Sequence, residues 1–149
     1  MDFDGEVIWE EASLVEIPAN SSDDYFDVNR WEFIYGKQLQ SLVFSAELLE
    51  SGNVISENTF YFRPFKELKI NKPELEYSIV KSDSGFDIEL KTNKLAKSIY
   101  LQIADEKGFF SDNYFDLLPG EKTSVNLKTK ISEDKLNEVL TVRTLDDAF

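Results

Sequence analysis

The 149-residue chain contains no cysteine and no histidine. Without cysteine, disulfides, thiolate metal sites and cysteine nucleophiles are excluded. Without histidine, the chain lacks the commonest general base and the commonest metal ligand of proteins. Any catalysis by this chain would have to use carboxylates, lysine or tyrosine.

Long apolar runs and an excess of positive charge are also missing. No stretch approaches the ~20 apolar residues that cross a bilayer, and residues 1–5 lack the basic and apolar regions of a signal peptide. The chain has 16 Lys and Arg against 29 Asp and Glu, a formal net charge of −13. We therefore expect neither a nucleic-acid partner nor a membrane partner, because both require positive charge on the protein. The compartment stays undecided, since a domain without disulfides can function in any of them.

The composition is nevertheless that of a folded protein. Hydrophobic residues make up 42% of the chain and aromatic residues 13%, which is enough for a packed core. The length suits one full domain or two small ones.

The second half of the chain has the rhythm of antiparallel strands. Apolar and charged side chains alternate strictly over residues 86–91, and alternation recurs over residues 99–103 and 123–129. This pattern is typical of half-buried strands. Ser132 is expected to cap a single helical turn. With turn signals roughly every 8–12 residues and no long helix, residues 74–149 are predicted to form an all-β sandwich.

The first half is less regular. Residues 40–49 and 54–62 are predicted to pair as a hairpin through a turn at residues 50–53. In residues 29–38, Asn29 could cap a helical turn that runs through Arg30 and ends at Gly36. Three further short strands are expected at residues 7–9, 14–17 and 25–28.

Residues 63–73 differ from both halves. They contain two prolines and only weak alternation, which favours an extended linker. We therefore predict a partial β-sandwich module at residues 1–64, a linker at 65–73 and a second β-sandwich domain at 74–149.

The densest mixture of aromatic, short polar and turn residues lies at residues 110–121, Phe-Ser-Asp-Asn-Tyr-Phe-Asp-Leu-Leu-Pro-Gly-Glu. Such a segment is usually a corner of a β-sandwich. A catalytic loop is the more specific alternative hypothesis. Its short polar side chains can hydrogen-bond the local backbone, and Pro119-Gly120 must reverse the chain. Asp112 and Asp116 could suggest calcium, but a calcium site needs six or more oxygens, so we expect both to cap turns.

This block of twelve residues resembles the signature of the C-terminal immunoglobulin-like domain in β-mannosidases of glycoside hydrolase family 2. Residues 95–101 and 140–145 resemble the strands that flank it. Residues 4–10, 17–22 and 56–58 are similar to the β-sandwich that precedes that domain in the same enzymes. The resemblance implies an immunoglobulin-like antiparallel β-sandwich preceded by a partial sandwich. It also implies a parent enzyme that removes terminal β-D-mannose with retention, through two glutamates in an upstream (β/α)₈ barrel.

The chain departs from that family in what it lacks. A (β/α)₈ barrel needs ~250 residues, and the opening strands of the first sandwich have no counterpart here. We therefore expect a non-catalytic accessory fragment with no catalytic residue, no cofactor and no metal. Its expected partner is the upstream barrel of the same polypeptide. The missing strands would leave a sheet edge that could pair with a second copy of the fragment.

Two other functions stay open. The chain could be a carbohydrate-binding module that recruits mannose-containing glycans, or a free-standing adhesion sandwich. A binding module would use exposed aromatic side chains, whereas Trp and Tyr also fill cores and domain interfaces. The candidates for a sugar or interdomain contact are Trp31, Tyr35 and Tyr114, and Trp31 leads because it lies in an irregular segment.

Overall fold

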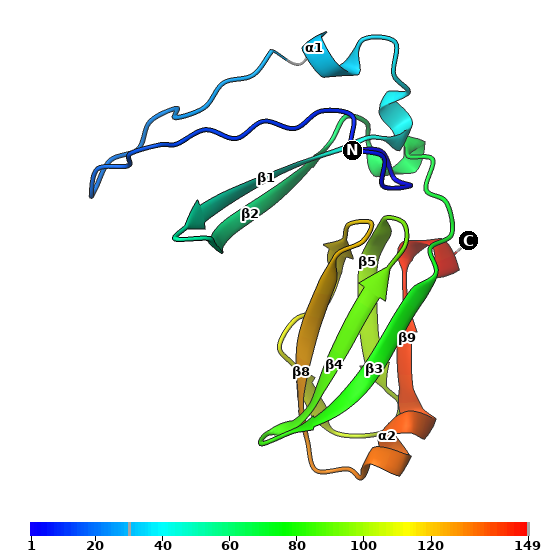
Figure 1. The fold of residues 1–149 in the computed structure, drawn as a ribbon. Coiled ribbons are helices and arrows are strands. Elements are labelled where there is room, and N and C mark those ends of the chain that lie inside the picture. Colours follow the sequence, from blue (N-terminus) through cyan, green and yellow to red (C-terminus); the bar gives the residue numbers. More distant parts are fainter. Residues whose placement is uncertain (30, 149) are drawn as a thin grey trace. The chain divides into compact units, whose positions relative to one another are not determined.

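The computed structural model describes residues 1–29 and 31–148 (Figure 1). Arg30, which falls in the predicted helical turn, lies outside the described residues. By its internal contacts the chain divides into two compact units. We call Met1–Asp2 with Glu6–Lys69 the hairpin unit, and Phe3–Gly5 with the chain from Ile70 onward the sandwich unit.

The sandwich unit consists of two antiparallel sheets. One has the strand order β3-β4-β8-β6 and the other the order β7-β5-β9, and Figure 1 shows most of these strands running along the same long axis. Four strands facing three match the layout of an immunoglobulin-like sandwich, which confirms the predicted all-β class. The elements are β3 (Leu75–Ser82), β4 (Gly85–Thr92), β5 (Ala96–Ile103), β6 (Gly108–Phe110), β7 (Phe115–Leu117), β8 (Lys122–Thr129), α2 (Glu133–Val139), β9 (Leu140–Arg143) and the 3₁₀ turn η3 (Leu145–Ala148).

The alternation noted in the sequence builds the core of this unit. Ile88 on β4 lies opposite Val125 on β8, and both are buried, as is Leu101 on β5 of the facing sheet. Successive side chains of a strand point to opposite faces, so one face of each sheet is apolar and the two apolar faces meet. The buried cluster comprises Phe86, Ile88, Leu90, Ala96, Ile99, Leu101, Ile103, Leu117, Val125, Leu127, Leu136 and Leu140.

The helix α2 is the predicted helical turn. The Ser132 hydroxyl accepts a hydrogen bond from the Lys135 backbone N–H at 3.3 Å, which satisfies one of the free donors at a helix start. Leu136 is fully buried in the core cluster. Burial of Leu136 explains why the turn continues to Val139 instead of ending at Leu136.

The sandwich unit also includes three residues from the start of the chain. The Phe3 carbonyl accepts a hydrogen bond from the Leu95 N–H at 2.9 Å, and the Asp4 carboxylate pairs with Lys94 at 2.8 Å. Gly5 adopts a φ of +96°, and a Cβ added there would lie 3.0 Å from Pro119. The turn predicted at these residues is therefore held by partners about 90 residues further along the chain.

The hairpin unit contains a single two-stranded ladder among its described residues. β1 (Val43–Glu50) pairs with β2 (Asn53–Tyr61), as predicted. Ser51 and Gly52 in the turn both have positive φ, at 53° and 83°, the geometry that matches the twist of a hairpin. Three short helical segments complete the unit: α1 (Trp31–Ile34), η1 (Leu39–Ser41) and η2 (Phe65–Glu67).

The strands expected at residues 7–9, 14–17 and 25–28 are wrong. None of these residues belongs to a sheet, although the chain runs extended through this region in Figure 1. Strand propensity is realised only where a neighbouring strand supplies hydrogen bonds and side-chain contacts. The one bridge that adds to the ladder of this unit joins Asp2 to Leu42.

Candidate functional site

All three predicted contact residues are exposed. Trp31 is 60% exposed, Tyr35 84% and Tyr114 69%. Their exposure is compatible with a contact to a ligand or another domain, and it excludes a role as core filler.

Trp31 and Tyr35 belong to the hairpin unit. The Asn29 side chain accepts a hydrogen bond from the Trp31 N–H at 3.2 Å, in the position predicted for a cap. Trp31 is the first residue of α1, and Tyr35 directly follows the last one, so two exposed aromatic residues bracket this helical turn. Tyr114 belongs to the sandwich unit, and we therefore treat it as a separate surface.

Tyr114 is held in an unusual conformation. Its φ is +63°, a region that costs a residue other than glycine about 1–3 kcal/mol. Its N–H donates to the Ile99 carbonyl at 2.7 Å. Its ring stacks on Tyr100, with centroids 4.9 Å apart and planes at 25°. The backbone bond and the ring stack together hold an exposed aromatic ring in one place.

Asn113 fixes the residue next to Tyr114. Its side-chain oxygen accepts from the Leu101 N–H at 2.8 Å, and its side-chain nitrogen donates to the Leu101 carbonyl at 2.9 Å. The amide group thus provides the two bonds that a neighbouring strand would supply to β5 at this point. As predicted, the short polar residues of the 110–121 block tie the backbone.

Asp116 ties the same block to the start of β5. Both carboxylate oxygens lie 2.8 Å from the Lys97 ammonium, and one accepts the Ser98 N–H at 2.9 Å. Lys97 is only 6% exposed. The two donors, Lys97 and Ser98, lie at the irregularity in the β5–β7 register between Ala96 and Ile99. Asp116 was expected to cap a turn, but it lies in β7 and bonds across to β5.

Asp112, another acidic residue of the block, has a local role. Asp112 accepts the N–H of Asn113 at 2.7 Å, as expected of a turn cap. Within residues 1–29 and 31–148 the structure has no group of three or more Asp or Glu side chains that could hold a metal ion. Also among these residues, no helix is long and apolar enough to cross a membrane.

Two carboxyl groups and the terminal amine have shifted pKa values. Hydrogen bonds from Lys94 and then Asn71 hold the pKa of Asp4 below its usual value. The backbone N–H of Thr144, supported by Lys72, lowers the pKa of Asp147. Desolvation lowers the pKa of the Met1 amine, which donates to the Val43 carbonyl at 3.0 Å. Both carboxyl groups are therefore partners of lysine side chains, at 2.8 Å for Asp4 and 3.4 Å for Asp147.

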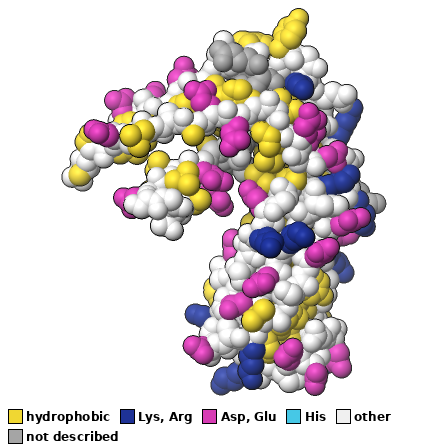
Figure 2. Space-filling model, viewed as in Figure 1, with side chains coloured by type: hydrophobic (Ala, Val, Ile, Leu, Met, Phe, Trp, Pro, Cys, Tyr) yellow, Lys and Arg dark blue, Asp and Glu magenta, His cyan; other side chains and the backbone are white. Residues whose placement is uncertain are grey.

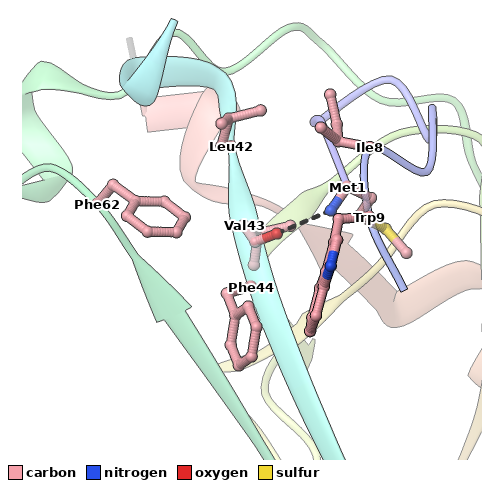
Figure 3. Close-up of a pocket in the computed structure, with 7 residues that line it drawn as sticks. All are labelled: Met1, Ile8, Trp9, Leu42, Val43, Phe44 and Phe62. Carbon is pink, nitrogen blue, oxygen red and sulfur yellow. Dashed lines mark hydrogen bonds between the residues drawn. The ribbon is translucent and has the colours of Figure 1, made fainter. Parts of the chain in front are cut away.

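An apolar depression lies at the base of the hairpin (Figure 3). The Trp9 and Phe44 rings in it stack with centroids 6.3 Å apart. Only ≈ 20 Å³ is open to water-sized molecules, about the room that one water needs. A sugar ring cannot enter it. The depression is lined by Met1, Ile8, Trp9, Leu42, Val43, Phe44 and Phe62.

The depression continues into a larger apolar surface, which we call the aromatic face: Trp9, Phe44, Phe60 and Phe62. Phe44 and Phe60 are cross-strand partners, and Phe60 meets Phe62 edge to face at 5.3 Å. Phe60 is exposed. On the opposite face of the hairpin two acidic residues, Glu47 and Glu57, lie directly across from one another, an arrangement that destabilises an isolated pair of strands.

A second hollow lies beside the edge strands β3 and β9. Its open volume is ≈ 180 Å³, below the ~300 Å³ at which ligand pockets usually begin. A carboxylate pair is needed to hydrolyse a glycoside, but the lining contains Asp147 as its single acid, and this acid pairs with Lys72 at 3.4 Å. The lining residues are Lys72, Pro73, Leu75, Tyr77, Val142, Thr144 and Asp147.

The sequence did not single out Tyr100, the ring beneath Tyr114. It occupies an outward position of an alternating strand, where polar residues are usual. An aromatic residue at such a position, close in the fold to the aromatic residues of the 110–121 block, is the signal that could have identified it.

Comparison with known proteins identifies both halves of the chain. The Ig-fold domain model of mannosidases matches residues 70–148, and the mannosidase Ig/CBM-like domain model matches residues 1–67. No curated protein matches the chain. Among solved structures, a β-D-mannosidase from Dictyoglomus thermophilum is similar in fold, with a TM-score of 0.80 at 20% sequence identity. The match covers 97% of this chain but 17% of that protein.

Proposed function

Because the chain belongs to the family of mannosidase Ig-fold domains, we propose that it is a non-catalytic accessory region of a β-mannosidase. The observation that carries this proposal is the succession of two mannosidase accessory domains over residues 1–67 and 70–148. The proposed parent is a glycoside hydrolase of family 2 that removes terminal β-D-mannose with retention, through glutamates in a (β/α)₈ barrel.

The proposed partner of the chain is that barrel, in the same polypeptide. A lone two-stranded hairpin is marginal in water, and the aromatic face leaves Phe60 exposed. Contact with another domain would remove this apolar surface from water and stabilise the hairpin. We therefore assign the aromatic face to the contact with the rest of the enzyme.

The activity of the chain alone tests the accessory role. The purified chain is expected to leave an aryl β-mannoside unhydrolysed, at the rate of a buffer blank. Turnover that survives repurification would overturn the proposal. The coding sequence upstream of Met1 supplies the second test: a (β/α)₈ barrel there supports the role, and an unrelated domain contradicts it.

Glycan binding is the second candidate function, and the exposure of Trp31 at the start of α1 and of Tyr35 just after it favours it. Mannose oligosaccharides would be titrated while tryptophan fluorescence is recorded. A saturable change that Trp31→Ala abolishes supports binding at α1. Trp9→Phe is the control, because it removes the other tryptophan and should leave the change intact.

A further inference from the structure

A second surface, distinct from α1, has the make-up of a sugar site. We propose that the outer face of the β7-β5-β9 sheet binds a neutral pyranose sugar, with the exposed ring of Tyr114 as its stacking platform. This inference extends the glycan-binding candidate to the sandwich unit, and it does not depend on the accessory role.

The platform is rigid before any ligand arrives. The Tyr114 backbone is fixed by its bond to Ile99, its ring by the stack on Tyr100, and its neighbour Asn113 by two bonds to Leu101. Pre-organised side chains lose little conformational entropy on binding. The protein accepts a strained positive φ at a bulky residue and yet leaves that residue 69% exposed. Strained backbone is concentrated at ligand sites.

Polar groups lie next to this platform on the same face. Arg143 on β9 is the cross-strand partner of Tyr100, and Thr141 is the partner of Gln102. The intervening pair, Leu101 and Val142, points inward to the core, so Tyr100, Gln102, Thr141 and Arg143 share the outer face. Cross-strand partners have Cβ atoms about 4.5–5.5 Å apart. Arg143 therefore lies directly across from Tyr100, and Gln102 and Thr141 lie two positions further along the same face.

This combination selects the class of ligand. A pyranose ring presents C–H groups on one face and hydroxyl groups around its rim. The C–H face suits an aromatic ring, and the hydroxyls suit the arginine, glutamine and threonine side chains, in the way that small-molecule sites combine apolar contact with a few placed polar groups. The chain's net charge of −13 disfavours an anionic ligand, although Arg143 carries one positive charge. A neutral sugar is not repelled by the net negative charge, and its hydroxyl groups can accept hydrogen bonds from Arg143.

The test is a titration of the whole chain followed by NMR. β-1,4-Mannobiose is the probe, and sorbitol is the control, because it has the hydroxyl groups of a hexose without the ring face. Saturable shifts are expected at the backbone amides of Leu101, Gln102 and Tyr114, with a Kd of about 1 mM, the weak end of specific binding. Sorbitol is expected to cause none.

Variants separate the platform from its surroundings. Tyr114→Asn removes the ring but tolerates positive φ, so the fold is kept and the affinity should fall at least about tenfold, or ~1.4 kcal/mol. Arg143→Gln should weaken binding severalfold. Tyr77→Asn, on β3 of the other sheet, is the matched control and should bind as the parent chain does.

The proposal would be overturned by the absence of saturable shifts, by equal shifts with sorbitol, or by shifts that persist unchanged in Tyr114→Asn. Shifts confined to the amides near Trp31 would also overturn it, while supporting glycan binding at α1. Shifts that appear at the Tyr114 face only on adding a separately expressed catalytic domain would identify that face as a protein contact and exclude the sugar site. None of these outcomes depends on whether the chain hydrolyses a mannoside.

Discussion

The two units of this chain differ in how their folded structures are stabilised. The sandwich unit closes twelve buried residues between two sheets, while the hairpin unit has one two-stranded ladder and leaves several large apolar side chains exposed. On the face shown in Figure 2, acidic side chains are scattered over both units. What distinguishes them is the amount of apolar surface that each unit removes from water, the main source of folding free energy.

The largest difference between the units is expected in the free energy of unfolding that is lost when a leucine is replaced by alanine. Leu127→Ala, at a 0% exposed position of β8, should lower the free energy of unfolding by about 3–5 kcal/mol, because it leaves a cavity. Leu49→Ala, at a 54% exposed position of β1, should change it by less than about 0.5 kcal/mol. Urea unfolding measures both. Equal losses would show that the hairpin unit has a core of its own.

The next largest effect is expected at the buried ion pair. Lys97→Met should destabilise the sandwich unit by about 3 kcal/mol, since it leaves the Asp116 carboxylate largely buried without its cation. Lys69→Met, at an exposed site of the hairpin unit, should have almost no effect. Denaturant midpoints of the two variants give the comparison. If the midpoints coincide, the Lys97–Asp116 pair does not stabilise the bulge in β5.

A smaller difference is expected between two asparagines. Asn113→Ala removes both bonds to the Leu101 backbone and should cost about 1–3 kcal/mol, because buried backbone groups lose their partners. Asn58→Ala, on the exposed strand β2, removes one bond to the next N–H and should cost little. Amide hydrogen exchange at Leu101 checks the mechanism, since it should accelerate in Asn113→Ala alone. Unchanged exchange would show that water replaces the amide group at no cost.

The smallest effect is a dependence on pH. Lys94 and Asn71 lower the pKa of Asp4 in the folded chain, so its contribution is complete above the unfolded pKa of ~4 and is lost as the pH falls through the lower folded value. Asp4→Asn should therefore reduce the loss of stability that acid causes. Thermal unfolding between about pH 2 and pH 6 covers this range. A loss of stability identical to that of the parent chain would exclude Asp4 as a source.

The sequence by itself determined most of the local structure. Alternation over residues 86–91 predicted β4, Ser132 predicted the start of α2, and the turn at residues 50–53 predicted the hairpin. These features depend on how often side chains return to the same face of a strand or helix and on backbone donors close in the sequence. Both can be recognised from a short stretch of sequence. For the 110–121 block, the sequence predicted hydrogen bonds from short polar side chains to the backbone, but it did not predict which backbone groups they reach.

Only the tertiary structure decided the features that join distant residues. It attached Phe3–Gly5 to the sandwich unit, buried Lys97 against Asp116, and stacked Tyr100 beneath Tyr114. It also left residues 7–9, 14–17 and 25–28 outside any sheet. In each case the outcome depends on whether a residue from elsewhere in the chain pairs with the residue in question. That partner cannot be identified from the residues next to it in the sequence.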